Sequence, residues 1–229
     1  GEWWVHTRVP PVTQIARRLH DGRDKVTRTV IVSNVDTALL VMGSDLDFSL
    51  RRLERYLALV RLAGVQAVVV LTKADTCDDM PARLDAVREV LPPDVCVVAV
   101  NALSEQSRVD LAAWLEMGRT LVLLGSSGAG KSTLTNTLIG HDAQATGSAR
   151  LGDGRGRHTT TTRSLHRTPE GACIIDTPGL RTLRLDADEG ALAASFVDIS
   201  QFAAQRRFRD CRHEQEPGCA VREQVAPQR

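Results

Sequence analysis

Short apolar runs rich in β-branched residues alternate along this chain with stretches of helical periodicity. The runs that predict strands are TVIVS (29–33), TALLVM (37–42), QAVVVLT (66–72), VCVVAV (95–100), TLVLLG (120–125) and ACIID (172–176). Their nearly continuous apolar character is typical of strands buried on both faces. The alternation predicts an α/β domain with a mostly parallel sheet, right-handed crossovers and helices on both faces. Ligands bind such sheets at the carboxyl ends of the strands.

Two helices are predicted from their periodicity and end signals. The first begins at Asp47, has an apolar face that includes Phe48 and Leu57, and ends at Gly64. The second begins at Pro81, because the fixed φ of proline suits a first turn, and continues to about residue 91.

Two stretches interrupt this alternation. Residues 141–163 are polar and glycine-rich and too long for a plain connection, which predicts either a functional loop or a disordered segment. Beyond about residue 185 the strand signal ends, and a helical stretch leads into a segment with Cys and His. We therefore expect a nucleotide-binding domain over 29–184, preceded by a linker region over 1–28 and followed by a small C-terminal helical lobe over 185–229.

Composition indicates an ordinary globular protein: of 229 residues, 42% are hydrophobic and 25% charged. The apolar runs are too short to span a bilayer, so we expect no membrane partner. Five cysteines are an odd number, and Cys96 and Cys173 lie in strand-like runs, which predicts that these two thiols are buried. Such cysteines suit a protein of the reducing cytoplasm. A net charge of +1 gives no global argument for nucleic acid. The basic stretches 17–28 and 206–213 are either solvated surface or local nucleic-acid contacts.

Residues 125–132 satisfy the phosphate-binding pattern GxxxxGK[ST], between a predicted strand and a helical stretch that ends at Gly140. The backbone amides of such a loop point at phosphate oxygens. Lys131 would place its charge at the β- and γ-phosphates, and Ser132 would offer its hydroxyl to Mg²⁺. The residues predicted to contact the nucleotide here are Gly125, Ser126, Ser127, Gly128, Ala129, Gly130, Lys131, Ser132 and Thr133.

The strand that ends at Asp176 continues into Thr-Pro-Gly, with Gly179 as the last residue of the motif. This arrangement places a carboxylate beside a metal ion and the Gly179 amide near a γ-phosphate, as phosphoryl transfer requires. Alone the motif is a strand followed by a turn. After a phosphate-binding loop it indicates the second half of a phosphoryl-transfer site.

The sequence TKAD at 72–75 is a candidate base-reading motif. The Asp75 carboxylate can accept hydrogen bonds from guanine N1 and its amine while the Lys73 stem covers the ring. Thr72 stands where the usual motif has Asn, which keeps a hydroxyl and loses an amide. Asn101 and Ala102 follow another strand, and we expect a backbone amide there to meet the guanine O6; a plain strand end is the alternative.

In chain order the motifs are TKAD, the phosphate-binding loop, RHTTTTR (157–163), DTPGL (176–180) and DCRHEQEPGCAV (210–221). In this order the sequence resembles the RsgA (YjeQ) family of circularly permuted bacterial GTPases, factors in small ribosomal subunit assembly. The order can be reversed because a parallel sheet depends on where strands lie and not on where the chain is cut. The resemblance implies a cytoplasmic, monomeric GTPase that uses GTP, GDP and Mg²⁺ and is stimulated by the small ribosomal subunit and its rRNA. It also implies that the first residues hold the end of an OB-like domain.

The resemblance implies further site residues. Thr160, within the Thr run, is expected to coordinate Mg²⁺ together with Ser132 and Asp176. Leu180 stands where small GTPases have a water-orienting Gln, so we expect His158 to orient the water, with Lys131 as the second catalytic residue. A solvated His158, or one that contacts rRNA, is the alternative.

The same resemblance implies a zinc knuckle in the C-terminal lobe. Cys211, His213 and Cys219 occupy ligand positions, but the first position, 206, is Arg. Because a structural zinc site has four ligands, the lobe either recruits a replacement or is held by packing alone.

We thus expect a GTP hydrolase that acts as a switch in assembly of the small ribosomal subunit. The alternative is a GTP-dependent rRNA- or protein-binding scaffold with negligible turnover. An ATP-using phosphotransferase is disfavoured by TKAD.

Overall fold

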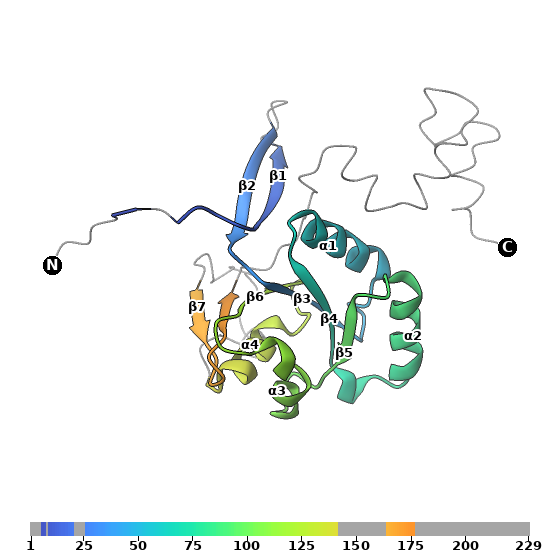
Figure 1. Ribbon diagram of the computed structural model, residues 1–229. Helices are drawn as coiled ribbons and strands as arrows, with labels where there is room; N and C mark the ends of the chain where they lie inside the picture. Colours follow the sequence, from blue (N-terminus) through green and yellow to red (C-terminus); the bar gives the residue numbers. More distant parts are fainter. Residues whose placement is uncertain (1–5, 8, 21–25, 142–163, 177–229) are drawn as a thin grey trace, which may run out of the picture. The chain divides into compact units, whose positions relative to one another are not determined.

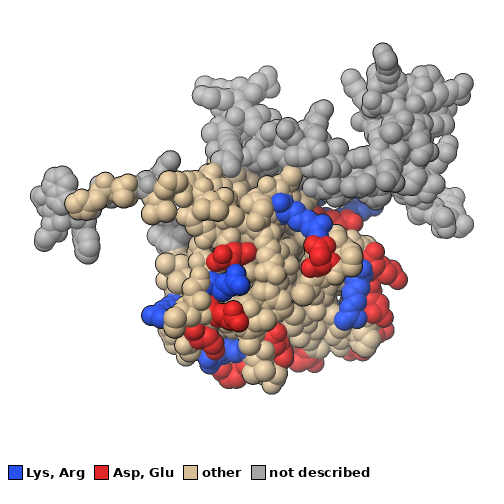
Figure 2. All heavy atoms as spheres, in the orientation of Figure 1, with Lys and Arg blue, Asp and Glu red and all other residues tan. Residues whose placement is uncertain are grey.

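The computed structural model of this chain describes residues 6, 7, 9–20, 26–141 and 164–176 (Figure 1). All of them belong to residues 1–186, the first of two units into which the chain divides. The predicted C-terminal lobe and the segment 142–163 lie outside the described residues. Figure 2 shows acidic and basic side chains interspersed on one face, without an extended patch of one sign.

Six strands form the main sheet in the order β5-β4-β3-β6-β8-β7. They are β3 (Thr37–Gly43), β4 (Gln66–Thr72), β5 (Cys96–Ala99), β6 (Thr120–Leu124), β7 (Ser164–Arg167) and β8 (Cys173–Asp176). All neighbours pair in parallel except β7, which is antiparallel to β8. The predicted α/β fold with a mostly parallel sheet is confirmed. The pattern did not predict β7, because this short edge strand lacks an apolar run.

Helices cover both faces of this sheet (Figure 1). The helices are α1 (Leu50–Leu62), α2 (Met80–Val90), α3 (Gln106–Asp110) and α4 (Lys131–Ile139), with 3-10 turns at Ala74–Thr76 and Ala112–Trp114. Leu40 and Met42 pack in the core that contains α1, while Leu39 and Val41 pack in the core that contains α4. Alternate residues of one strand thus enter two cores, which is why the strands are apolar throughout.

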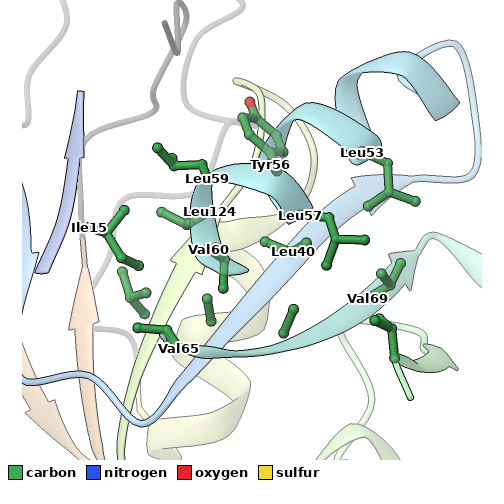
Figure 3. Close-up of a cluster of buried hydrophobic side chains, with 14 of the residues drawn as sticks. Ile15, Leu40, Leu53, Tyr56, Leu57, Leu59, Val60, Val65, Val69 and Leu124 are labelled. Atoms are coloured by element: carbon green, nitrogen blue, oxygen red, sulfur yellow. The ribbon is translucent and has the colours of Figure 1, made fainter. Parts of the chain in front are cut away.

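The core under α1 contains side chains from the helix and from the neighbouring strands β3, β4 and β6, among others (Figure 3). Leu53, Leu57 and Val60 of α1 lie over Leu40 of β3 and Leu124 of β6. All five side chains are buried. Complete burial of such side chains contributes about 1.5–3 kcal/mol each, so this core holds the strands that carry both candidate motifs.

A separate two-stranded antiparallel hairpin, β1 (Gln14–His20) with β2 (Val26–Ser33), precedes the sheet. The prediction that 29–33 joins the parallel sheet is wrong. Only residues 34–36 separate β2 from β3, and a parallel neighbour needs a crossover of a dozen or more residues. The run therefore pairs back on β1, and its apolar residues Ile31 and Val32 join the core under α1.

The helix ends differ slightly from the prediction. Helix α1 begins at Leu50 and not at Asp47, because the Asp47 carboxylate accepts a hydrogen bond from the Gly43 amide (3.1 Å) and does not cap the helix. Helix α2 begins one residue before Pro81, and Asp79 caps it by accepting from the Ala82 amide at 3.0 Å.

The prediction of two buried thiols is wrong for Cys96. This residue begins the edge strand β5 and is exposed, whereas Cys173 is partly buried. An apolar run does not reveal which strand lies at the edge of a sheet. Within the described part of the chain, every helix is too short or too polar to cross a membrane.

Candidate nucleotide-binding site

The carboxyl ends of the central strands bring the two candidate motifs together. Gly43, the last residue of β3, pairs with Thr72 of β4, and Leu40 pairs with Leu124 of β6. The base motif and the phosphate-binding loop therefore both follow the carboxyl ends of strands, β4 and β6, that lie on either side of β3. This arrangement explains how motifs in reversed order reach one site.

The phosphate-binding loop follows β6 directly and approaches β3 very closely. A Cβ atom on Gly125 would lie 2.2 Å from the Val41 carbonyl oxygen, so only glycine fits there. Gly128 and Gly130 have φ of +86° and +88°. A Cβ on Gly128 would meet nothing within 4 Å, so the loop is open on that side. This open turn, followed at once by α4, has the geometry of an anion-binding nest at a helix N-terminus.

Lys131 is the first residue of α4, and only 9% of its surface is exposed. Its Nζ donates to the carbonyl oxygens of Gly125 (3.0 Å) and Ser126 (2.5 Å). The ammonium group therefore lies over the loop and does not extend into solvent. Ser132 and Thr133 follow in the first turn, where the helix dipole favours an anion.

The base motif is tied directly to the phosphate-binding loop. Thr72 is completely buried, and its Oγ1 donates to the Ala129 carbonyl oxygen at 2.7 Å. The hydroxyl that replaces the usual Asn side chain thus makes a contact between the two motifs. Lys73 follows in the left-handed region at φ 59°, and Asp75 is exposed in the next turn. The assignment of guanine recognition to these two side chains stays a prediction.

Asn101 and Ala102 follow β5 at the same edge of the sheet. The Asn101 side-chain Oδ1 accepts from the Leu103 amide at 3.0 Å, and its carbonyl accepts from Ser107 Oγ at 2.7 Å. Thr137 of α4 donates to the Ala102 carbonyl at 2.6 Å. These bonds hold the turn against the helix that carries Lys131. A contact from its backbone to guanine O6 stays a prediction.

The loop between β3 and α1, residues 44–49, also contacts both motifs, which the sequence did not predict. Asp47 Oδ1 accepts from Ser126 Oγ at 2.5 Å, and Asp45 Oδ2 pairs with Lys73 Nζ at 2.6 Å. The hydrogen bond from Lys73 lowers the pKa of Asp45 below its usual value, so this carboxylate is ionised at neutral pH. Two carboxylates directly after a central parallel strand are the signal that would have indicated this loop.

Asp176 is the last residue of β8, and β8 lies beside β6 with Ile175 opposite Val122. The backbone of Asp176 is thus at the edge that carries the phosphate-binding loop. Its side chain and residues 177–180, including Gly179, lie outside the described part. So do His158, Thr160, Cys211, His213 and Cys219. Among the described residues, no group of three or more His, Cys, Asp or Glu side chains could hold a metal ion.

The model of the family described as RsgA GTPase matches residues 13–186. This chain belongs to the RsgA GTPase family. The resemblance seen in the motif order is therefore confirmed.

Curated relatives include proteins named small ribosomal subunit biogenesis GTPase RsgA. The one from Xylella fastidiosa (strain M12) is 50% identical over 212 residues, which cover 93% of this chain and 63% of that protein. The one from Xanthomonas campestris pv. campestris (strain B100) is 49% identical over 238 residues, which cover 100% of this chain and 66% of that protein. This chain thus spans less than two thirds of the length of these RsgA proteins.

Two solved structures share the fold. YjeQ from Thermotoga maritima aligns with a TM-score of 0.56 and 25% identity, over 95% of this chain and 69% of that one. YloQ, described as a circularly permuted GTPase, aligns with a TM-score of 0.53 and 24% identity, over 96% of this chain and 75% of that one. The permuted strand order of this RsgA-family chain therefore has counterparts of known structure.

Proposed function

We propose that this chain forms the nucleotide-binding part of a GTP hydrolase that acts as a switch in assembly of the small ribosomal subunit. The observation that carries the proposal is the Thr72–Ala129 hydrogen bond of 2.7 Å, which joins a base-reading motif to a phosphate-binding loop. Two motifs so joined can bind both ends of one nucleotide. Membership of the RsgA GTPase family supports the same activity.

The phosphate end of the nucleotide would be held by the loop 125–130 and by Lys131. The amides of the loop and the N-terminus of α4 favour a polyphosphate, and the Lys131 ammonium adds a positive charge beside it. The hydroxyl of Ser132 and the carboxyl of Asp176 are hard oxygen donors, and these fit Mg²⁺. When bound, Mg²⁺ neutralises charge that develops on the phosphoryl group. In our proposal Thr160 would supply a further oxygen ligand to this ion.

The water-orienting role is assigned to His158, because Leu180 has no polar group that could hold a nucleophile. His158→Ala should bind GTP as the parent does and lose about 10- to 100-fold in stimulated turnover, which at most reaches the lower limit of about 100-fold for one positioned acid–base group. A stimulated turnover within about twofold of the parent would exclude a catalytic role, because that change lies well below the tenfold effect, or about 1.4 kcal/mol, that is the least expected of a catalytic group here.

The base end is assigned to Asp75 and Lys73, with the backbone at Asn101 and Ala102 meeting the guanine oxygen. Asp75→Asn replaces the carboxylate acceptor by an amide that donates. It should weaken GTP by about 1–3 kcal/mol, the cost of an unpaired buried polar group, and leave ATP unaffected. Competition of GTP and ATP against a fluorescent guanine nucleotide measures both. An unchanged preference for GTP would refute the assignment.

The partner that we propose is the small ribosomal subunit, bound by a cytoplasmic monomer. The relatives carry that subunit in their names. The segment after Asp176, which would respond to the γ-phosphate, leads directly into the C-terminal residues. Hydrolysis would therefore change the contacts of that region. A scaffold with negligible turnover is the outcome if subunits bind without raising phosphate release.

Zinc in the C-terminal region is tested separately. Cys211 and Cys219 supply two soft thiolates and His213 supplies an imidazole nitrogen, while Arg206 stands at the remaining ligand position. If a replacement ligand completes the site, purified protein should carry near-stoichiometric zinc, and Cys211→Ser should lose it. A preparation free of zinc would indicate a lobe held by packing alone.

A further inference from the structure

The loop between β3 and α1, residues 44–49, contacts the phosphate-binding loop and the base motif at the same time. We call it the acidic loop, since it carries Asp45 and Asp47. It belongs to neither motif of the proposed nucleotide site. It leaves the sheet between them because β3 lies between β4 and β6.

Asp47 is held rigidly and offers a fixed acceptor to the phosphate-binding loop. Its Oδ2 accepts from the Gly43 amide at 3.1 Å, and Arg52 of α1 donates to its Oδ1 at 2.6 Å. Arg52 also donates to the Asp47 carbonyl oxygen. The same Oδ1 accepts from Ser126 Oγ at 2.5 Å, and the Asp47 side chain is only 14% exposed. Charge-assisted bonds of this kind are short and directional, so they fix the position of Ser126.

Asp45 holds the lysine of the base motif in the same way. Its Oδ2 lies 2.6 Å from Lys73 Nζ, while its Oδ1 accepts from the Asp47 amide at 3.1 Å. A Cβ atom on Gly43 would lie 2.6 Å from Asp45 Oδ1, so a larger residue at this position would displace the Asp45 carboxylate. The Asp45 and Lys73 side chains are 42% and 34% exposed, and exposed pairs add little to folding stability. The pair therefore has its main effect on the orientation of Lys73.

We propose that the acidic loop is a third nucleotide-positioning element of this domain: Asp47 orients the phosphate-binding loop through Ser126, and Asp45 orients Lys73. The proposal rests on the proposed binding of guanine nucleotides. Together with the Thr72–Ala129 bond, these contacts join three loops in a closed ring. A loop that is ordered before binding spends less of the binding energy on ordering. Both aspartates are positioning residues, because neither needs to contact the nucleotide.

The test compares guanosine, which has the base without phosphate, with GDP, both in competition against a fluorescent GDP analogue. Asp47→Ala should weaken GDP about 10-fold and guanosine less than about twofold, because its effect passes through the phosphate-binding loop. Asp45→Asn should weaken both ligands by the same factor, about 3- to 10-fold, because its effect passes through the base end. A loss of folded protein would also weaken both ligands by one common factor, so it cannot produce the Asp47→Ala pattern. Asp45→Asn is therefore assayed under conditions in which urea unfolding shows that it is fully folded, and an unchanged affinity of the folded variant would contradict the role of Asp45.

Two further variants make the test specific. Ser126→Ala removes the donor of the Asp47 bond, so the double variant with Asp47→Ala should bind GDP no more weakly than the weaker single variant. If Asp47→Ala fails to fold, Ser126→Ala must show the same selective loss of GDP. Asp94→Asn is the matched control, since it breaks an ion pair of the same length (Arg61 Nη2 to Asp94 Oδ1, 2.6 Å) that involves neither motif. It should change neither affinity.

The outcomes separate this proposal from the proposed function. A parent protein that does not bind GDP overturns the guanine-nucleotide function. If the parent binds GDP and both the Asp45→Asn and the Asp47→Ala variant bind guanosine and GDP as tightly as the parent does, the role of the acidic loop alone is overturned. An Asp47→Ala variant that loses affinity for guanosine and GDP by the same factor also overturns the role of the acidic loop, because the effect of Asp47 would then not act through the phosphate-binding loop.

Discussion

Replacement of Thr72 by Val tests whether a single hydroxyl couples the base motif to the phosphate-binding loop. Valine has nearly the same shape, so the change removes the Thr72 Oγ1 donor without opening a cavity. The lost bond to the Ala129 carbonyl is 2.7 Å long, and both residues are completely buried. A buried hydrogen bond contributes about 0.5–1.5 kcal/mol, and an acceptor left unpaired costs about 1–3 kcal/mol. We therefore expect Thr72→Val to lower the free energy of unfolding by about 1–3 kcal/mol.

The same change should weaken nucleotide binding, because part of the binding energy must then order the released loop. We expect a loss of about 3- to 10-fold in GDP affinity, measured by titration with a fluorescent GDP analogue. Stability is measured by urea unfolding in the absence of nucleotide. Thr37→Val is the matched control: Thr37 is also buried, and its Oγ1 donates to Gln66 Oε1 at 3.2 Å at the opposite end of β3. It should affect stability alone.

The reasoning is refuted if Thr72→Val binds GDP with the affinity of the parent while its stability falls as expected. In that case the hydroxyl stabilises the sheet edge without positioning the loop. A stability within about 0.5 kcal/mol of the parent would refute the assigned magnitude, since that is the range of neutral surface changes.

Three further predictions concern the edge of the sheet and its core. Gly125→Ala should prevent nucleotide binding and lower the unfolding midpoint, because the new Cβ would lie 2.2 Å from the Val41 carbonyl oxygen. Gly64→Ala is the control: Gly64 has a φ of +66° and open space around its Cβ position, so this change should lower stability without affecting nucleotide binding. The hydrogen bond from Lys73 lowers the pKa of Asp45 from its ordinary value of 3.8. The stabilisation that the Asp45–Lys73 pair provides is therefore complete above pH 3.8 and is lost only as the pH falls through the lower pKa of the folded state. Guanosine affinity should then be constant between about pH 5 and about pH 8, and a decrease across that range would contradict the pairing. Leu40→Ala, at a fully buried position, should cost about 2–5 kcal/mol in urea unfolding, and a cost below about 1 kcal/mol would contradict its place in the core.

The strands that precede the motifs were predictable because each is a local apolar run. The runs at 37–42, 66–72 and 120–125 became the three central strands. The run at 29–33 has the same local pattern but pairs in a hairpin, because its connection to β3 is too short for a crossover. The length of the connection between two strands is therefore as informative as their apolar composition about which strands pair with each other.

The contacts within the candidate site were not predictable from local pattern. Thr72 looked like a weakened base motif, but its hydroxyl reaches Ala129, which is distant in the sequence. Asp47 looked like the start of a helix, but its carboxylate accepts from Ser126. Each of these bonds depends on which strands are neighbours in the sheet. Sequence reasoning identified the motifs and could not identify the residues that hold them together.

The most direct test of the proposed switch is GTP hydrolysis by the purified chain, measured as phosphate release alone, with small ribosomal subunits and with large ribosomal subunits in parallel. Our account predicts slow release by the chain alone and a clear increase with small subunits only. Asp75→Asn should lower the stimulated rate at limiting GTP by about 5- to 160-fold, the factor that corresponds to 1–3 kcal/mol. Equal rates with both subunits, or small subunits that bind the chain without any increase in phosphate release, would contradict a hydrolytic switch on the small subunit.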